Sequence, residues 1–189
     1  IRTVGYATIR GVIQNYEAGP ASAGTCKLIL DGSGIYSYNG FLRVGSGGNL
    51  SLQKTGTGTQ TLTGAQITYT GATTIDAGIL SLQDTSGFNS PTAIGATFDL
   101  RRTVAGFANR ISIGQSFTGA GSIIVNNTGV GIAGGHFLVG SSVFSLTGAI
   151  TINSGVFGTD GTTANWSACT ADVNVGADGV FSLRANSIM

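Results

Sequence analysis

Short runs of alternating apolar and polar residues, separated by turns that contain glycine, constrain the fold of this chain most strongly. They recur from residue 41 onwards, among them Leu50/Leu52, Ile123/Val125, Ile150/Ile152 and Phe181/Leu183. Such alternation has the period of a β-strand with one buried face. Gly, Asn or Asp follows most runs, and no amphipathic helix is evident. The sequence therefore predicts an all-β fold.

Two pairs of segments repeat along the chain. Residues 71–80 align without gaps on residues 148–157 with five of ten positions identical, and residues 44–52 align on 175–183 with five of nine identical. Each segment has an apolar residue, a small turn with Gly, and an apolar strand. Repeated units of this kind share a continuous core when they stack on one another.

The repeats favour a parallel β-solenoid over an antiparallel β-sandwich or jelly roll, which also uses many short strands. At roughly 20 residues per coil, we expect about nine coils. Residues 1–40 are the least regular and are expected to form irregular strands and loops. Residues 41–189 are expected to form the solenoid, as one continuous domain and a fragment of a larger protein.

Composition narrows the classes of function. The chain has 189 residues, of which 32 are Gly and 9% are charged, with a net charge of +1. Disorder is not expected, because 41% of the residues are hydrophobic and distributed along the chain. The absence of a basic run argues against nucleic-acid binding, and no apolar stretch is long enough to span a membrane. Low charge with abundant Thr, Ser and Gly is typical of secreted or surface proteins.

No residue pattern indicates a catalytic centre, a metal site or a cofactor. His136 has no partner of suitable type nearby in sequence, and a loop or surface position is the simpler interpretation. A carbohydrate-active β-helix would need acids, arginines and aromatic residues on one face. The candidates for such a ligand face are Asp99, Arg101, Arg102 and His136.

The two cysteines, Cys26 and Cys169, are 143 positions apart. In a solenoid that separation corresponds to some 30 Å along the axis, whereas a disulfide needs Cα atoms within about 7 Å. A bridge within one chain is therefore not expected. Two interpretations stay open: a disulfide between the end of one subunit and the start of the next, or two buried free thiols.

Residues 52–82 resemble the autotransporter-associated β-strand repeat of bacterial passenger domains. The first half of the repeat has Leu52, Lys54, Gly56, Gly58, Leu62 and Gly64. The second half has Tyr69, Gly71, Thr73, Ile75, Gly78, Leu80 and Leu82. The segment Gln66–Thr68 is one residue longer than is typical, and residues 143–157 match only the second half.

The resemblance implies a right-handed parallel β-helix on an extracellular or cell-surface bacterial protein. It implies a non-enzymatic scaffold or adhesin stalk. Separately, the open ends of a solenoid expose unpaired strand edges, so we expect association with a second copy or with neighbouring repeats, head to tail into fibres. The alternative is a polysaccharide-degrading or glycan-binding β-helix, with host or matrix glycans as partners. The glycines expected at turns are Gly64, Gly71, Gly78, Gly148 and Gly155. The residues expected in the core are Leu62, Ile75, Leu80, Leu82, Ile150, Ile152, Val173, Val175 and Leu183.

Overall fold

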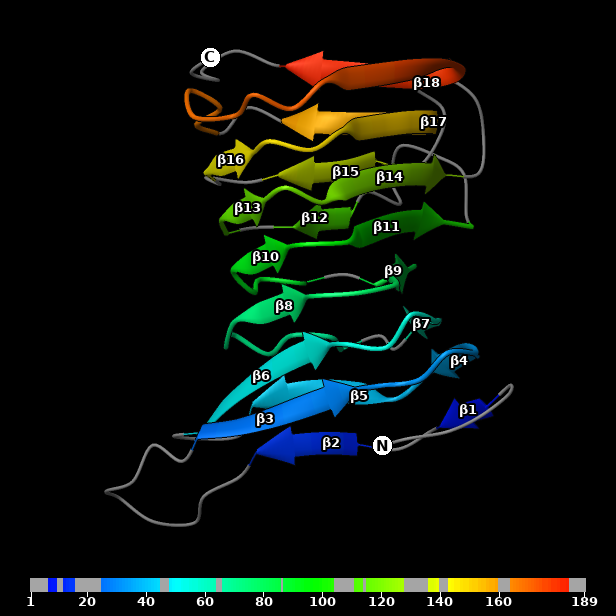
Figure 1. The fold of residues 1–189 in the computed structure, drawn as a ribbon, viewed down its shortest axis with the longest axis vertical. Coiled ribbons are helices and arrows are strands. Elements are labelled where there is room, and N and C mark those ends of the chain that lie inside the picture. The colour runs from blue at the N-terminus through cyan, green and yellow to red at the C-terminus, as the bar shows by residue number, and fades with distance from the viewer. Residues whose placement is uncertain are drawn as a thin grey trace.

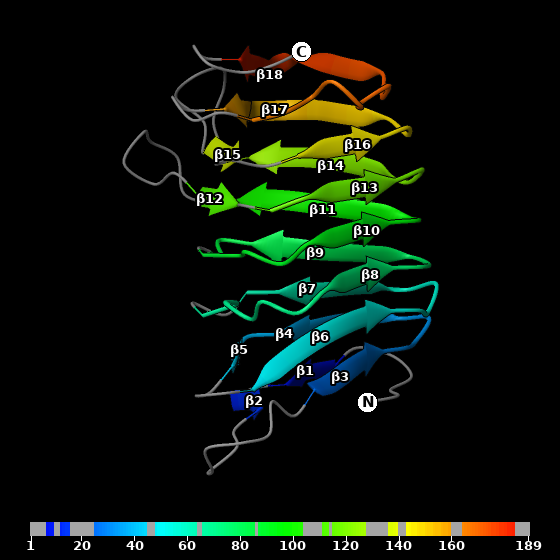
Figure 2. The same ribbon diagram turned by 90° about the vertical axis from the view of Figure 1, so that its left-hand side faces the viewer.

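The structure is a computed structural model of the chain. It describes residues 7–9, 12–15, 25–44, 48–63, 66–85, 87–103, 111–113, 115–127, 136–139, 143–159 and 164–183. Within these ranges the chain winds as a stack of short strands, with the first strands at one end and β18 at the other (Figures 1 and 2). All strand pairs in these ranges are parallel. The predicted parallel β-solenoid is confirmed, and the antiparallel alternative is wrong.

Two sheets make up two sides of the solenoid, and each strand pairs with the corresponding strand of the next coil. Sheet I stacks β1 (Ala7–Ile9), β4 (Ile35–Tyr38), β7 (Thr59–Leu62), β9 (Ile79–Gln83), β11 (Thr97–Arg102), β14 (Ser122–Asn127), β17 (Ile150–Thr159) and β18 (Val173–Leu183). Sheet II stacks β3 (Thr25–Leu30), β6 (Asn49–Lys54), β8 (Thr73–Ile75), β10 (Thr92–Ile94), β13 (Phe117–Gly119) and β16 (Phe144–Leu146).

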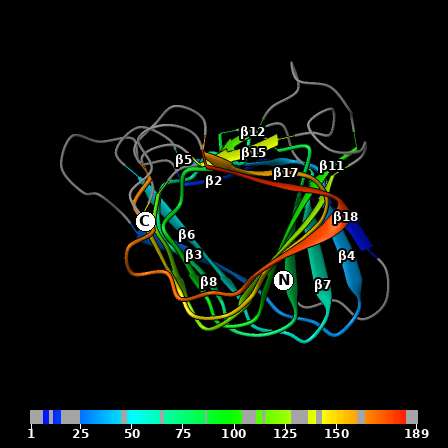
Figure 3. The same cartoon turned by 90° about the horizontal axis from the view of Figure 1, so that it is seen from above.

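A third side closes the coil, as the view along the axis shows (Figure 3). It contains β2 (Val12–Asn15), β5 (Phe41–Val44), β12 (Ile111–Ile113) and β15 (His136–Val139). The long strands β17 and β18 turn the corner from sheet I, so that their second halves also lie on this side: Val156 of β17 pairs with His136 of β15. Strands from residues 1–40 continue the same stacks, because β1 pairs with β4 and β3 pairs with β6.

The coils vary in length. Paired residues on adjacent coils are 18 positions apart at Ile79 and Thr97, but 29 apart at Ala7 and Tyr36. The six strands of sheet II make five steps, so about five complete turns carry both sheets. The expectation of about nine coils is therefore wrong. It assumed 20 residues per coil, whereas most coils are longer, and it counted the ends of the chain, where β1 and β18 extend sheet I beyond the strands of sheet II.

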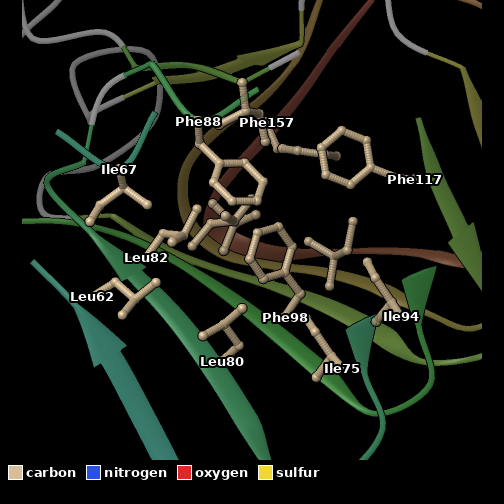
Figure 4. Packing of buried hydrophobic residues seen from close by; sticks show 14 of the residues in the cluster. Leu62, Ile67, Ile75, Leu80, Leu82, Phe88, Ile94, Phe98, Phe117 and Phe157 are labelled. Atoms are coloured by element: carbon tan, nitrogen blue, oxygen red, sulfur yellow. The ribbon is translucent and has the colours of Figure 1, made fainter. Parts of the chain in front are cut away.

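Side chains alternate between the interior and the surface along the strands, as the sequence predicts. In β6 and β7 every second residue is buried. Six expected core residues are at most 1% exposed: Leu62, Ile75, Leu80, Leu82, Ile150 and Ile152. Several of these side chains point toward one another from sheets I and II inside the coil (Figure 4).

Three expected core residues are not fully buried, and all of them lie on β18. Val173 is 38% exposed and Val175 is 49% exposed, while Leu183 is partly buried. Val173 and Val175 pair with Ile150 and Ile152, which are both 0% exposed. The alternation therefore predicts correctly that Val173 and Val175 face the interior. Both are exposed because no described strand covers β18 on its far side.

Aromatic rings stack through the interior along the solenoid axis. Phe117 lies between Phe98, at a centroid distance of 6.2 Å, and Phe144, at 5.1 Å. Trp166 stacks on Phe144 with its ring centroid 3.9 Å away and the two planes 2° apart. Such contacts add to burial of apolar area, so this aromatic column ties each coil to the next.

Candidate functional site

Asp99 is the centre of a polar ladder on the outward-facing side of sheet I, although Asp99 itself is only 3% exposed. Its Oδ2 accepts a hydrogen bond from Ser81 Oγ at 2.9 Å and pairs with the Arg101 Nε, while its Oδ1 accepts from Asn126 Nδ2 at 2.7 Å. Asn153 Nδ2 extends the ladder by donating to Asn126 Oδ1 at 2.8 Å. Both carboxylate oxygens are therefore engaged across three coils, which is typical of a structural role.

Arg102 points to the other side of β11 from Arg101. It is 8% exposed, and its NH1 lies 3.3 Å from Asp84 Oδ1. Asp84 also accepts hydrogen bonds from the backbone N–H and the hydroxyl of Thr103. This second cluster holds the corner where the chain leaves sheet I.

Of the expected ligand face, the structure describes the side chains of Asp99, Arg101 and Arg102, and these three do not form one group. Asp99 and Arg101 are paired on the outward-facing side of sheet I, where Asp99 is buried, whereas Arg102 is turned inward to Asp84. His136 begins β15, whose backbone pairs with β17 on the third side, and its side chain lies outside the part of the structure that is described. Of the set, the structure brings together Asp99 and Arg101, and both side chains belong to the polar ladder.

Cys26 lies on β3 at one end of sheet II, and Cys169 follows β16 beyond the other end; both are free thiols, but Cys26 is exposed and Cys169 half-buried, so they are not the two buried thiols expected as one alternative. Thr170 N donates to Leu146 O, which aligns Cys169 with Leu146, and successive register pairs align Leu146 with Leu30 on β3. Cys26 lies four residues before Leu30. Six steps of about 4.8 Å separate the two levels, far beyond the reach of a disulfide within one chain.

Four of the five expected turn glycines are in described positions where a side chain is not accommodated. A Cβ at Gly71 or Gly148 would lie 2.3 Å and 2.0 Å from a backbone oxygen of the coil below. Gly78 and Gly155 have φ of +69° and +78°, which favour glycine. Gly64 lies outside the described residues.

Lys54 is an interior cation. It falls in the buried register of β6, where alternation predicts an apolar residue rather than a charged one. It is 2% exposed, and its Nζ donates to the backbone oxygens of Gly56 and, at 3.2 Å, of Ala77. Burial lowers the pKa of Lys54, and the nearby charge of Asp31 partly offsets this effect. The ammonium thus donates hydrogen bonds to backbone oxygens at two consecutive corners between sheets II and I.

Tyr69 heads a fully buried chain of hydroxyls that the sequence did not indicate. Its hydroxyl is hydrogen-bonded to Thr73 Oγ1 at 2.6 Å, Thr73 Oγ1 to Ser90 Oγ at 2.7 Å, and Ser90 Oγ donates to Gly71 O at 2.6 Å. Burial raises the pKa of Tyr69, although the hydrogen bonds with Thr73 and Ser90 act in the opposite direction.

The raised pKa of Tyr69 predicts a loss of stability in alkali. Below pH 10 the phenol is neutral in both the folded and the unfolded chain, so its contribution is complete there. Above about pH 10 the unfolded chain releases the proton first, and the free energy of unfolding falls by about 1.4 kcal/mol per pH unit for this group. We expect Tyr69→Phe to show a shallower fall in urea titrations between about pH 9.5 and 11. Equal slopes in both proteins would contradict this assignment.

Two hollows lined by described residues carry no charged side chain. One, of about 150 Å³, lies on the outer surface of sheet II between Thr74, Ala93 and Thr118. A second, of about 200 Å³, lies at the β18 end between Trp166, Cys169 and Phe181. Among the described residues, no three His, Cys, Asp or Glu side chains come together as metal ligands. No described helix is long and apolar enough to span a membrane.

The fold and its ladders define a parallel β-solenoid built from strand–corner–strand repeats. Residues 52–82 match the family described as passenger-associated-transport-repeat, which confirms the predicted repeat. The matched segment runs from β6 through β7 and β8 to β9, and therefore spans more than one turn of the stack. Searches of curated proteins and of solved structures give no match.

This combination of repeat and fold fits the β-helix of an autotransporter passenger. The family suggests a secreted or surface location for proteins that carry the repeat.

Proposed function

We propose that the chain is a non-enzymatic, rod-like scaffold of a bacterial surface or secreted protein, and that it holds an adhesive or recognition surface at a distance. The proposal rests on the hydrogen bonds that polar side chains make between adjacent coils. Asp76, Asp84 and Asp99, the three aspartates of the middle coils, all accept hydrogen bonds from residues of neighbouring coils. Groups used in this way stiffen the stack, which supports a scaffold over an acid–base catalyst.

The lengths of the connections between strands support a binding surface on one side of the solenoid. Sheet II is joined to sheet I by short corners, such as the two residues Gly95 and Ala96 between β10 and β11. The connections from β11 to β12 and from β14 to β15 are longer, and both lead from sheet I to the third side. In solenoids, insertions collect on one face, which is often the binding face.

The scaffold proposal includes end-to-end association, because solenoid ends expose strand edges that pair readily. Electron microscopy of the purified chain is the first test, with glycan-array binding and polysaccharide turnover measured on the same sample. The scaffold predicts rods and no turnover of any glycan, with or without binding. Glycan cleavage would overturn the proposal in favour of the carbohydrate-degrading alternative.

A further inference from the structure

In the second coil, the two residues Asn39 and Gly40 join β4 of sheet I to β5 of the third side. Asn39 is exposed, and both residues lie outside the strands. This corner lies within the stack, because Tyr38 just before it pairs with Ile9 of the coil below and with Leu62 of the coil above. Described strands of two neighbouring coils therefore hold the corner in place.

Asparagine is chemically labile, and an asparagine followed by glycine reacts with its own backbone. The backbone nitrogen of Gly40 attacks Cγ of Asn39 and closes a cyclic imide. The N–Cγ bond forms and the Cγ–Nδ2 bond breaks, and Nδ2 leaves as ammonia with the proton that the Gly40 nitrogen gives up. Water then opens the ring at either carbonyl carbon, which leaves an aspartate or an isoaspartate. Glycine favours the ring closure, because it has no Cβ to obstruct the attack and its backbone turns freely.

Sequence and hydrogen bonds single out Asn39 among the asparagines. It is the only asparagine of the chain that glycine follows. The amides of Asn126 and Asn153 are held in the polar ladder of sheet I, where Asn126 donates to Asp99 at 2.7 Å and accepts from Asn153 at 2.8 Å. No described residue is hydrogen-bonded to the Asn39 amide. The Asn39 side chain is therefore exposed and not held in one orientation by such a bond.

We propose that Asn39 and Gly40 form a self-modifying corner, which loses the Asn39 amide spontaneously in the folded protein and gains an aspartate or an isoaspartate. The reaction consumes water, releases ammonia and needs no enzyme. It places a negative charge on a corner that carries none when the chain is made. The modification is independent of the proposed scaffold function, and its extent records the age of each copy.

An isoaspartate changes the geometry of this corner more than an aspartate does, because it adds a methylene carbon to the main chain. The hydroxyl of Tyr38, a residue 5% exposed, donates to Phe41 O at 3.1 Å and so spans both residues of the corner. Beyond it, Leu42 N donates to Gln66 O and Thr68 N donates to Leu42 O, both at 2.9 Å. The longer corner is expected to loosen these bonds of the third side, while β4 keeps its pairing in sheet I because it precedes the corner.

Ageing of the purified chain tests the site. The chain is incubated at mildly alkaline pH, which favours loss of the proton from the Gly40 nitrogen. Peptide mass spectrometry is predicted to show the mass gain of deamidation at Asn39, and an isoaspartate-specific methyltransferase is predicted to label the same peptide. Asn126 and Asn153 are predicted to keep their amides over the same period. Because Gly40 is buried, a sample unfolded in urea is aged in parallel. An Asn39 that stays intact in the folded chain would overturn the proposal, whether or not the unfolded sample reacts.

Two variants separate the chemistry from its structural effect. Asn39→Gln keeps the amide but lengthens the side chain, so no conversion is predicted at this position in the same period. Asn39→Asp supplies the charge without the extra main-chain carbon. Hydrogen exchange of the Leu42 and Thr68 amides is predicted to be faster in the isoaspartate-containing fraction than in Asn39→Asp. Conversion of Asn39→Gln at the native rate would rule out ring closure onto Gly40, and equal exchange would overturn the loosening of the third side.

Discussion

Phe117→Ala is expected to lower the free energy of unfolding by about 3–5 kcal/mol, the usual range for removing a buried ring. Phe117 is 0% exposed and stacks between Phe98 and Phe144. Because each coil of a solenoid contacts mainly its neighbours, the cavity interrupts the aromatic column between the two halves of the stack. Urea unfolding followed by circular dichroism measures the change.

The control for this variant is the next residue, Thr118→Ala, which changes the outward face of the same strand. Thr118 is partly exposed, so a loss within about 0.5 kcal/mol is expected. A loss below about 1 kcal/mol for Phe117→Ala would contradict the packing described for the interior.

Gly148→Ala is expected to cost about 3 kcal/mol, at the upper end of the range for overpacking. A Cβ at Gly148 would lie 2.0 Å from Gly121 O and 2.5 Å from Ala120 O. Both atoms belong to the backbone of the coil below, which cannot move aside as a flexible side chain does. The methyl group would therefore separate two coils at the corner between sheets II and I.

Gly95 occupies an equivalent corner and provides the control. Its Cβ would lie 3.1 Å from Ile75 O, so small shifts accommodate it, and Gly95→Ala is expected to cost less than about 1 kcal/mol. Thermal unfolding of both variants ranks them directly. If Gly95→Ala were the more damaging of the two, the close approach at Gly148 would be wrong.

The sequence predicted the fold class because the period of alternation and the corner glycines are local signals. Ile150 and Ile152 were placed in the core from alternation, and Leu62 and Leu80 from the repeat motif, and all four are buried. The number of coils depends on the lengths of the connections between strands, and the sequence of a connection has no alternation that would reveal its length. The third side was not predicted, since its strands are short and three of its connections exceed six residues.

The internal repeats proved to be equivalent in form but not in position. Residues 71–80 pass from sheet II to sheet I, with Gly78 at the corner. The matching residues 148–157 pass along sheet I to the third side, with Gly155 at a different corner. A strand–glycine–strand unit therefore serves more than one corner, which explains why the repeats are unevenly spaced along the chain.

The candidate site was predicted less well, because charge in a sequence does not show which side of a strand a residue occupies. Arg101 and Arg102 are neighbours in sequence, yet one joins the outer ladder and the other pairs with Asp84. The buried roles of Lys54 and Tyr69 depend on carbonyl and hydroxyl groups of other coils. Such partners become apparent only when the coils are stacked.

Distances along one column of sheet II test the stacked fold most directly. Ile29, Ala93, Thr118 and Ser145 share an outward column, three, four and five steps apart from Ile29. Spin labels at Ile29→Cys and at each of the other three positions, in a background without Cys26 and Cys169, are read by electron paramagnetic resonance. The solenoid predicts separations that grow by about 5 Å per coil, from about 14 Å to about 24 Å. Separations that do not increase in this order would contradict the parallel stack on which the scaffold rests.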